Sequence, residues 1–430
     1  MITLCEKREK WPVQGEIITI GNELTSGMTL DVNGWYAAGR LTASGLQVTR
    51  ITSVGDDYAS VSQALKSAMK ESSFVIVTGG LGSTDDDITN EIVSKALQRP
   101  LCLDKEMFEI IKRHTASHGA EMCRSLEKMA WVPDGSKMLS PEGKACGFSL
   151  VENDVRLYFL PGVPDQMRYL IDHAVIPELR SLYTKLPVTM CRTLKVYGLS
   201  EPRIAEIFRD LNKKTGKALI GFYPHFPENH ITVSLTTERA RDGLHELDRI
   251  ETLIRKELGP AVFATGEDSM AEIVGKVLSA RKLTVSVAES CTGGLIGHLL
   301  TAVPGSSRYF LGGIVSYGNE AKTELLGVQA ETLEDYGAVS NETVREMAEG
   351  VRNRLHSDLG IAVSGIAGPG GGTREKPVGT VHLSLASAEE TPSQGYRFWG
   401  NRHAVKLNSA TMALDWIRRY ANGDPLLPGI

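Results

Sequence analysis

The stretch VSVAESCTGG, residues 285–294, joins a short apolar run to a polar turn that ends in two glycines. The run VSVA has the length of a buried strand, and the segment GLIGHLLTAV that overlaps the turn is typical of a helix. Ligands of open parallel sheets collect beyond the carboxyl ends of the strands. The stretch therefore predicts a strand–turn–helix unit of an α/β domain, with Ser290 and Thr292 beside a ligand site. A simpler interpretation is that one of these two side chains only caps the helix.

Two later segments support a ligand site in the same region. The segment GGIVSYGNEAK, residues 312–322, reads as a strand whose end carries Tyr317, Asn319 and Lys322. The segment IAVSGIAGPGGG, residues 361–372, reads as another strand that ends in a glycine-rich loop. Amides of this loop, and the unpaired amides that open the helix after VSVAESCTGG, could hold a phosphate, although glycine-rich strand ends are often only turns.

The same segments contain candidates for nucleophilic catalysis. A serine hydroxyl needs a neighbour that removes its proton, and a lysine does so only where burial or positive charge lowers its pKa. Lys322 is the candidate base for Ser290, and the alternative is an exposed lysine on a helix that starts at Asn319. Cys291 is a rival nucleophile because a helix N-terminus lowers the pKa of a thiol, and its alternative role is a small buried hydrophobic residue. His298 lies about 12 Å further along the helix than Ser290, at about 1.5 Å per residue, so direct contact is not expected.

The rest of the chain predicts a modular α/β protein. Its 430 residues suggest two or three domains. Short β-rich runs alternate with helical stretches near both ends, which favours sheets covered by helices on each face. We predict two three-layer α/β domains with mainly parallel sheets, joined by a small α+β domain. The predicted boundaries are 14–175, 176–262 and 266–424.

Composition and charge exclude several classes of protein. The net charge is −5 and the pI about 6.1, so nucleic acid is not an expected partner. The first residues lack the apolar core of a signal peptide, and no later apolar run reaches the ~18 residues of a membrane span. Six scattered cysteines have no zinc-ligand spacing, which fits free thiols in a reducing compartment. We therefore expect a cytoplasmic protein that does not contact membranes.

A second candidate site lies in the first domain. The segment FVIVTGGLGSTDDDIT, residues 74–89, places a glycine-rich turn and Asp85, Asp86 and Asp87 after a strand. Carboxylates repel a phosphate unless a cation lies between them, and Mg²⁺ is the usual bridge. Asp31 follows the first strand, at the same edge of the predicted sheet. The alternative is that Asp86 or Asp87 caps the next helix and interacts with its dipole.

The third domain contains the motifs AESCTGG, VSYGNEAK, GAVSNETVREMAEG and SGIAGPGGG with PVGTV. Together these motifs resemble the C-terminal domain of the CinA family. The resemblance implies hydrolysis of the carboxamide of nicotinamide mononucleotide (NMN) to nicotinic acid mononucleotide and ammonia. It implies Ser290 as nucleophile and Lys322 as base. We expect no cofactor, because a Ser/Lys hydrolase needs none. Tyr317 could orient Lys322 or stack on the nicotinamide ring, and the alternative is a core tyrosine at a strand end. The expected substrate-binding residues are Glu289, Cys291, Thr292, Gly293, Gly294, Asn319, Ser364, Gly365, Gly368 and Gly370.

The first domain resembles the N-terminal domain of the same family, which is similar to the MoaB/MogA fold, through EIITIGNELTSG, GGLGSTDDDIT and LPGVPDQM. In some members this domain is linked to metal-dependent ADP-ribose pyrophosphatase activity. The implied phosphate-site residues are Gly79, Gly80, Gly82 and Asn33, and the implied ligands of Mg²⁺ or another cation are Asp31, Asp86 and Asp87. The sequence departs from the family pattern in DVN for DTN, in Ser83 for proline and in SPEGKACGF for NPxGTAPGF, and SLEKMAWVP lacks the Asn-x-Lys-Gln run.

A different class of function is also compatible with these motifs. The MoaB-like domain could bind a pterin or a nucleotide without turnover, or recruit a protein partner. The small central domain, expected to be KH-like, contains His225 and His230 around FPEN in a predicted hairpin. Two histidines without a third ligand favour a turn over a metal site. We expect this domain to orient the outer domains or to contribute to a homodimer.

Overall fold

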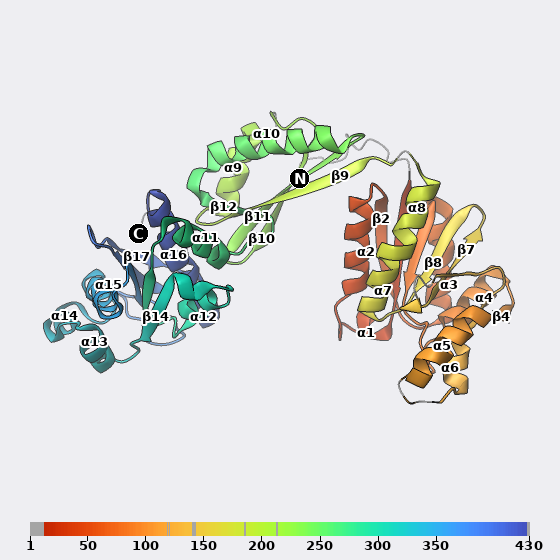
Figure 1. Cartoon of the computed structure of the whole chain (residues 1–430), viewed down its shortest axis with the longest axis horizontal. Coiled ribbons are helices and arrows are strands. Elements are labelled where there is room, and N and C mark those ends of the chain that lie inside the picture. The colour runs from red at the N-terminus through yellow and green to blue at the C-terminus, as the bar shows by residue number, and fades with distance from the viewer. Residues whose placement is uncertain are drawn as a thin grey trace. The chain divides into compact units, whose positions relative to one another are not determined.

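The computed structural model describes residues 13–117, 119, 121–139, 143–184, 186–211 and 214–427. Residues 1–12, where we expect no signal peptide, and residues 140–142 of the SPEGKACGF segment lie outside the described residues. The chain forms two compact units (Figure 1). One unit contains the described residues up to Met190 together with 235–244, and the other contains the remainder.

The N-terminal domain is built on a six-stranded mixed sheet with the order β2-β1-β3-β8-β7-β6. The first four strands of this order are mutually parallel, and the last two pair antiparallel. The strands are β1 (Gln14–Ile20), β2 (Gln47–Val54), β3 (Phe74–Thr78), β6 (Lys137–Leu139), β7 (Gly147–Glu152) and β8 (Val155–Leu160). A small separate ladder pairs β4 (Leu101–Leu103) with β5 (Trp131–Pro133).

Helices cover both faces of this sheet because successive strand residues point to opposite sides. Ile18 of β1 packs in one core with α3 and α4, and its neighbour Ile17 packs in a second core with α2, α7 and α8. This arrangement confirms the predicted three layers. The helical elements are α1 (Asn22–Thr25), α2 (Val32–Ala43), α3 (Tyr58–Glu71), α4 (Thr89–Leu97), α5 (Lys105–Ser117), α6 (Arg124–Lys128), α7 (Pro164–Leu170), the π-helical turn η2 (Ile171–Val175) and α8 (Ile176–Leu182).

The small central domain has a β-α-β-β-α-β order and a four-stranded sheet, β10-β11-β9-β12. Helices accompany this sheet and β10 pairs with β11 as a hairpin, so the α+β prediction is confirmed. The elements are β9 (Val188–Val196), α9 (Glu201–Leu211), β10 (Leu219–His225), β11 (Glu228–Thr237), α10 (Ala240–Leu258), the 3-10 turn η4 (Gly259–Ala261) and β12 (Val262–Thr265).

The C-terminal domain has a five-stranded sheet with the order β14-β13-β15-β16-β17. The first three strands are parallel, and β16 pairs antiparallel with both of its neighbours. The strands are β13 (Val285–Glu289), β14 (Phe310–Val315), β15 (Leu359–Gly365), β16 (Thr380–Ala386) and β17 (Ser393–Arg397). The helical elements are α11 (Met270–Arg281), α12 (Leu295–Thr301), the 3-10 turn η5 (Ser306–Arg308), α13 (Asn319–Leu326), α14 (Ala330–Tyr336), α15 (Asn341–Leu355) and α16 (Arg402–Asn422).

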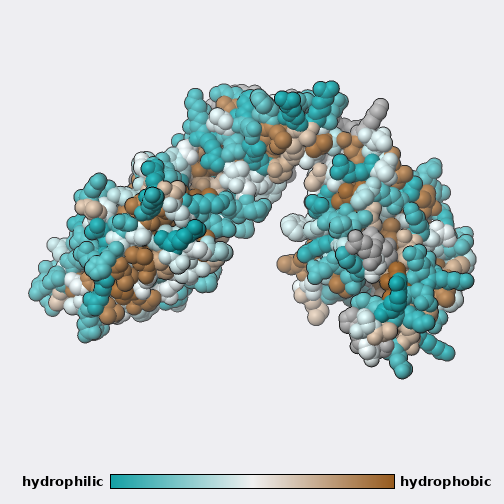
Figure 2. All heavy atoms as spheres, viewed as in Figure 1, coloured by the Kyte–Doolittle hydropathy of each residue, from teal (hydrophilic) through white to brown (hydrophobic). Residues whose placement is uncertain are grey.

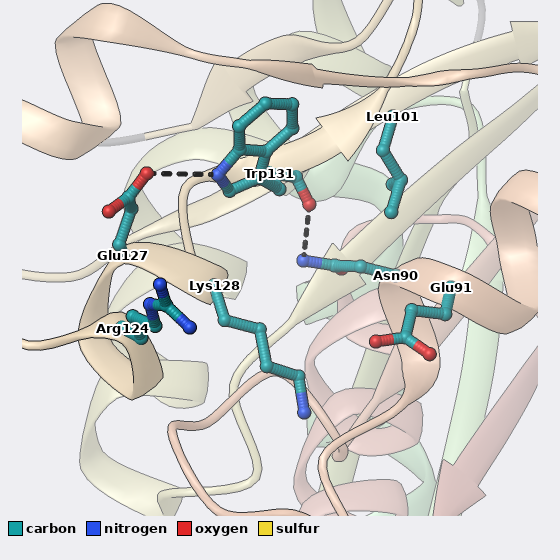
Figure 3. Close-up of a pocket in the computed structure, with 7 residues that line it drawn as sticks. All are labelled: Asn90, Glu91, Leu101, Arg124, Glu127, Lys128 and Trp131. Atoms are coloured by element: carbon teal, nitrogen blue, oxygen red, sulfur yellow. Dashed lines mark hydrogen bonds between the residues drawn. The ribbon is translucent and has the colours of Figure 1, made fainter.

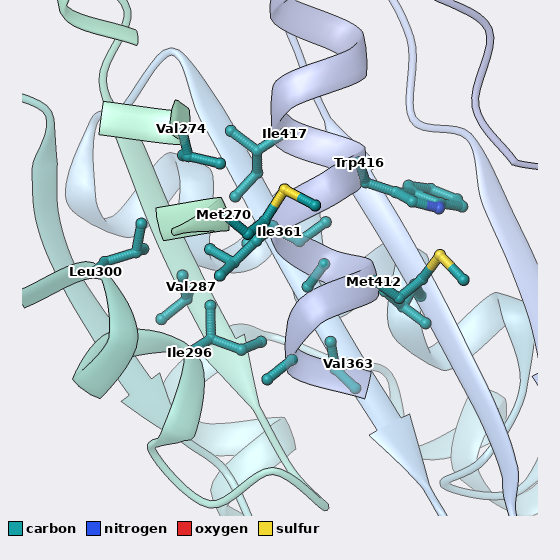
Figure 4. Packing of buried hydrophobic residues seen from close by; sticks show 14 of the residues in the cluster. Met270, Val274, Val287, Ile296, Leu300, Ile361, Val363, Met412, Trp416 and Ile417 are labelled. Carbon is teal, nitrogen blue, oxygen red and sulfur yellow. The ribbon is translucent and has the colours of Figure 1, made fainter. Parts of the chain in front are cut away.

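The core of this domain lies between the sheet and two of its helices. Figure 4 shows Met270 and Val274 of α11 next to Ile417 of α16, with Val287 and Ile361 of the strands in the same cluster. A second core on the opposite face packs α15 against the sheet, so this domain is also three-layered. The edge strand β14 leaves Leu311 and Val315 at 44% and 50% exposure, and Figure 2 shows hydrophobic side chains on this part of the surface. No helix in the described part of the chain is both long and apolar enough to cross a membrane.

Candidate active site

The predicted ligand site lies where the order of the C-terminal sheet changes direction. Strand β13 is followed in the chain by β14 on one side and later by β15 on the other, so its carboxyl end is a topological switch point. The Ser290 amide donates to the Val363 carbonyl of β15 at 3.0 Å, and the Ser316 amide after β14 donates to the Glu289 carbonyl at 2.8 Å. These bonds fix Ser290 between the ends of its two neighbouring strands.

The structure brings Ser290 and Lys322 into direct contact. Lys322 Nζ lies 3.2 Å from Ser290 Oγ. Lys322 occupies the first turn of α13, where helical side chains lean back toward the N-terminus and thus toward the strand ends. Ser290 is 7% exposed and Lys322 only 1% exposed, so the alternative of a solvent-exposed lysine is wrong.

The surroundings of Lys322 suit a neutral amine. Its Nζ also contacts the carbonyl oxygens of Ser316 at 2.8 Å and Tyr317 at 3.2 Å. Burial lowers the pKa of the Lys322 side chain, and the positive end of α13 acts in the same direction. A neutral amine has two N–H donors and one lone pair. When the two carbonyls accept both donors, the lone pair is left to accept the proton of the Ser290 hydroxyl.

Glu289 occupies the helix start that we expected to be open to an anion. Its carboxylate is 1% exposed and accepts hydrogen bonds from the amides of Gly294, Ile296 and Gly297 at 2.9–3.1 Å. This corrects the expectation that Glu289 binds substrate, because its carboxylate is bonded to main-chain amides of the same loop and helix. The start of α12 is likewise unavailable for a substrate phosphate.

The two glycines allow the sharp turn between Glu289 and α12. Gly293 and Gly294 have φ angles of 60° and 93°, which favour glycine. The Gly293 amide donates to the Ser290 carbonyl at 3.1 Å and closes the turn. The amides of Cys291 and Thr292 are then the ones that flank the nucleophile without a main-chain acceptor among the described residues.

Cys291 is a packing residue. Its side chain is 4% exposed and belongs to the hydrophobic core beneath the loop. Burial raises the pKa of the Cys291 thiol to about 12, so the thiolate expected at a helix start does not form at neutral pH. Two expectations for Cys291 are thereby corrected: that its thiol is the nucleophile, and that its side chain contacts the substrate. The adjacent Thr292 hydroxyl is buried and has no hydrogen-bond partner among the described residues.

Tyr317 and the glycine-rich loop meet at a residue that sequence reasoning missed. The Tyr317 ring is 61% exposed, so the alternative of a core tyrosine is wrong. Arg402 at the start of α16 donates to the Tyr317 hydroxyl at 3.0 Å and to the Gly368 carbonyl at 2.8 Å. Lys406, one helical turn later, lies beside the Gly293 turn. The sequence signal for this cationic pair was the spacing of Arg402 and Lys406, which lie one turn apart at the start of a helix.

The remaining substrate-binding candidates of this domain differ in exposure. Asn319 is exposed at the first position of α13, and the buried Ser364 hydroxyl donates to the Ala338 carbonyl at 2.6 Å. Ser364 is thus held within the fold, at the position before Gly365 ends β15. Gly370 is exposed in the loop, and no main-chain acceptor for its amide occurs among the described residues.

Neither His298, for which the sequence predicts no contact with Ser290, nor His382 is hydrogen-bonded to the nucleophile. His298 is exposed on α12, as its helical distance from Ser290 predicts. The ring of His382 on β16 is hydrogen-bonded to Asn341 at 2.8 Å, and burial lowers its pKa. Lys322 is therefore the base that the geometry favours.

In the N-terminal domain, Asp31 and Asn33 hold loops in place. Asp31 caps α2 by accepting from the Gly34 amide at 2.8 Å, and it also accepts from the Thr19 hydroxyl at 3.1 Å. The Asn33 amide nitrogen donates to the Thr78 hydroxyl at 3.2 Å and to the Gly162 carbonyl at 2.8 Å. The DVN segment thus connects the ends of three strands.

The aspartates after β3 do not cap the next helix. Helix α4 starts at Thr89, and its N-cap residue Ile88 makes no side-chain cap bond. Asp87 instead accepts from the Thr84 amide at 2.9 Å, and Asp86 is exposed. The capping alternative is therefore wrong. Among the described residues, Asp31, Asp86 and Asp87 do not form a compact group of potential metal ligands.

Acidic groups nevertheless gather at this edge of the sheet. Burial raises the pKa of Asp56, and the nearby charges of Glu23, Asp86 and Asp87 raise it further, against a hydrogen bond from the Asn22 amide. Sequence reasoning missed Asp56, which follows β2 in the segment VGDD. A cation is the natural counterion for such a group of carboxylates.

The glycines after β3 have a packing reason. A Cβ atom on Gly79 would lie 2.1 Å from the Ile20 carbonyl, one on Gly80 would lie 2.2 Å from Thr89 Oγ1, and one on Gly82 would lie 2.4 Å from Asp87 Oδ2. Gly79 and Gly80 also have φ angles of 111° and 65°, so a larger residue is disfavoured there, whereas at Gly82 the Asp87 side chain would have to move.

A cavity of about 320 Å³ lies near this loop, lined by residues that include Arg124, Lys128 and Trp131 (Figure 3). Lys128 Nζ donates to the Thr84 carbonyl at 3.1 Å, which places a cation next to the aspartates. Carboxylates and a lysine thus lie close together at this edge of the N-terminal sheet.

Fold and site together define a modular α/β protein with a buried Ser–Lys pair at a switch point. Three family models match: "Probable molybdopterin binding domain" over residues 16–181, "Damage-inducible protein CinA KH domain" over 191–264, and "CinA C-terminal domain" over 267–421. The chain belongs to the CinA family. The KH-like expectation for the central domain is confirmed.

Relatives agree with this assignment. A "CinA-like protein" from Desulfotalea psychrophila is 40% identical over 406 residues, which cover 94% of this chain and 98% of the relative. A second, from Syntrophotalea carbinolica, is 40% identical over 405 residues, covering 94% and 97%. Among solved structures, the competence/damage inducible protein CihA from Agrobacterium tumefaciens is 41% identical, with a TM-score of 0.35, and the match covers 36% of this chain and 93% of that one.

Proposed function

We propose that the C-terminal domain hydrolyses the carboxamide of NMN to nicotinic acid mononucleotide and ammonia. The observation that carries the proposal is the 3.2 Å contact between Ser290 Oγ and the buried Lys322 Nζ. A serine paired with a desolvated amine is a recurrent arrangement for acyl transfer from amides. The family resemblance of the motifs around both residues supports NMN as the amide.

The proposed reaction proceeds through an acyl-enzyme. Ser290 Oγ attacks the carboxamide carbon while its proton moves to Lys322 Nζ. Lys322 then returns this proton to the leaving nitrogen, the C–N bond breaks, and ammonia departs. Water attacks the resulting ester, gives a proton to Lys322, and releases nicotinic acid mononucleotide as Ser290 regains its hydrogen. The amides of Cys291 and Thr292 are the nearest candidates to hold the negative charge that develops on the carbonyl oxygen.

The phosphate of the nucleotide has a separate set of candidate partners. Arg402 and Lys406 supply two positive charges beside the reacting loop, and Arg402 also ties Tyr317 to the glycine-rich loop. The free amide of Gly370 adds a neutral donor. Since Glu289 already occupies the start of α12, these groups replace that helix as the proposed phosphate site.

The direct test is ammonia release from NMN by the purified full chain. Ser290→Ala abolishes release in our proposal, whereas Cys291→Ala retains it because the thiol is protonated and packed in the core. Activity persists in chelator, since a Ser/Lys hydrolase needs no metal. Full activity of Ser290→Ala with loss in Cys291→Ala would exclude the assignment, and loss of all activity in chelator would count against it.

For the N-terminal domain we propose cation-dependent binding of a nucleotide diphosphate such as ADP-ribose, with pyrophosphate cleavage as its activity. The acidic group around Asp56 and Asp86 and the adjacent Lys128 support this choice. Mg²⁺ held by those carboxylates would neutralise the diphosphate oxygens. Incubation with Mg²⁺ and ADP-ribose is expected to yield AMP.

The second candidate for this domain is pterin binding without turnover, favoured by the molybdopterin-binding family model that covers it. A thermal shift with a pterin, together with no AMP from ADP-ribose, would select the binding function. AMP formation that Asp86→Ala abolishes would select the hydrolase.

A further inference from the structure

The turn of the β10–β11 hairpin gathers three potential metal ligands. The strand register pairs His225 directly with Glu228, and Tyr223 with His230. Residues two positions apart on a strand share a face, so His225, Glu228 and His230 all lie on one face of the hairpin. The sequence shows the two histidines, but only the register adds the carboxylate between them.

The three side chains are already close to one another. Glu228 Oε1 lies 2.8 Å from His230 Nε2, and the rings of His225 and His230 stack with centroids 4.5 Å apart. One potential ligand atom from each residue lies within 4.8 Å of the others. In the described part of the chain, no other histidine, cysteine or carboxylate side chains form a group of three this compact.

We propose that His225, Glu228 and His230 form a site for a divalent transition metal ion such as Zn²⁺. Two imidazoles and one carboxylate are a known ligand set for zinc sites that keep a fourth position open. Metal–ligand bonds of about 2.0–2.2 Å require ligand atoms within about 4.2 Å of each other. His225 is exposed, so rotation of its side chain closes the remaining gap.

The protein partly buries the side chains of Glu228 and His230 and leaves a cavity beside the proposed metal site. Glu228 and His230 are 13% and 19% exposed, and the Asn229 side chain between them donates to the Leu199 carbonyl at 2.9 Å. His225 and Glu228 line a cavity of about 370 Å³, which has room for a water or an anionic group at the fourth position. An ion pair of Glu228 with His230 alone would leave the stacked His225 without a role.

The test is titration of the chelator-stripped full chain with Zn²⁺ by calorimetry, and with Co²⁺ by visible absorption. One equivalent binds to the wild type, and the Co²⁺ spectrum shows nitrogen ligation. His230→Ala and His225→Ala each weaken this equivalent by at least about 100-fold, the upper end of the cost of losing a partner that only orients a ligand. Glu228→Gln weakens it as well.

Two matched variants complete the design. His245→Ala removes an exposed histidine of α10 and retains the equivalent. Asp86→Ala also retains it, which separates this site from the aspartates of the N-terminal domain. Because His225 is exposed, His225→Ala remains informative even if His230→Ala fails to fold. Zn²⁺ affinity equal to wild type in folded His225→Ala and Glu228→Gln, or no bound equivalent in the wild type, would overturn the proposal.

Discussion

The two α/β domains place glycine-rich turns at the carboxyl ends of parallel strands, but the charged groups beside these turns differ in exposure. In the C-terminal domain Lys322 is 1% exposed, and its amine lies within hydrogen-bond distance of a hydroxyl and two carbonyls. In the N-terminal domain Asp86 projects into solvent. Desolvation makes the lysine a usable base, whereas an exposed carboxylate stays ionised and attracts cations.

The comparison shows that similar strand–loop–helix geometry supports different chemistry. The buried contact between Ser290 and Lys322 in the C-terminal domain suits the covalent catalysis that we propose. The acidic group around Asp56 and Asp86 in the N-terminal domain suits the cation-dependent phosphate binding that we propose. Four substitutions test this contrast.

The largest effect is expected at Lys322. Lys322→Met lowers kcat/KM for NMN by about 10³-fold or more, because the proton of Ser290 then has no acceptor. Lys322→Arg also fails, since a guanidinium does not deprotonate. Lys276→Met, on the exposed face of α11, serves as the control and keeps activity.

The pH profile checks the same residue. The base works only when deprotonated, and burial lowers the pKa of Lys322. Wild-type kcat/KM therefore rises with pH and levels off below the ordinary lysine value of 10.5. A plateau reached only above that value would contradict a desolvated base.

Asp415 tests the energetic importance of buried charge in the C-terminal domain. Asp415 is fully buried on α16 and accepts from Arg418 and Arg419, which are 3% and 4% exposed. Asp415→Ala leaves two buried guanidinium groups without their carboxylate, and we expect a loss of about 3–5 kcal/mol in the free energy of unfolding. Urea denaturation measures it.

The control for Asp415 is an ion pair on the surface. Asp268→Ala breaks the pair with Lys276, whose side chain is 61% exposed, and should cost less than about 1 kcal/mol. Equal losses in Asp268→Ala and Asp415→Ala would show that burial does not distinguish the two sites.

Arg402 tests the proposed phosphate site. Arg402→Ala removes the bonds to Tyr317 and Gly368 and one positive charge, so KM for NMN should rise by about 10–100-fold, the usual value of a charged hydrogen bond. The increase should be much smaller for nicotinamide riboside, which lacks the phosphate. An equal increase for both substrates would indicate a purely structural role.

The smallest effect is expected at Asp86. In the absence of metal, Asp86→Ala leaves the melting temperature and NMN hydrolysis unchanged, because its side chain is exposed and belongs to the other domain. It reduces the thermal stabilisation by Mg²⁺ with ADP-ribose. Differential scanning fluorimetry compares the variant with the wild type, and an unchanged ligand shift would argue against a role for this carboxylate.

Sequence reasoning succeeded where the signal is local. The segment GLIGHLLTAV was predicted as a helix, and α12 lies within it. The helix start at Asn319 was also predicted correctly. Domain types and sheet layers followed from the alternation of short strands and helices.

Sequence reasoning failed where a group's role depends on distant neighbours. Arg402 and Tyr317 are 85 positions apart, and no local pattern links them. The Glu289 carboxylate accepts the amides at the start of α12, so a protein side chain already occupies the expected anion site. Cys291 has the sequence position of a reactive thiol and the surroundings of a core residue.

The order of strands and helices, the glycine turns and the residue types at the strand ends can be read from the amino-acid sequence, because they depend on neighbours a few positions away. The folded structure is needed to see which of those residues are buried, which amides are already bonded, and that Glu228 lies beside two histidines. Reactivity and metal affinity depend on desolvation and on three-dimensional proximity. Both arise only when segments distant in the chain pack together.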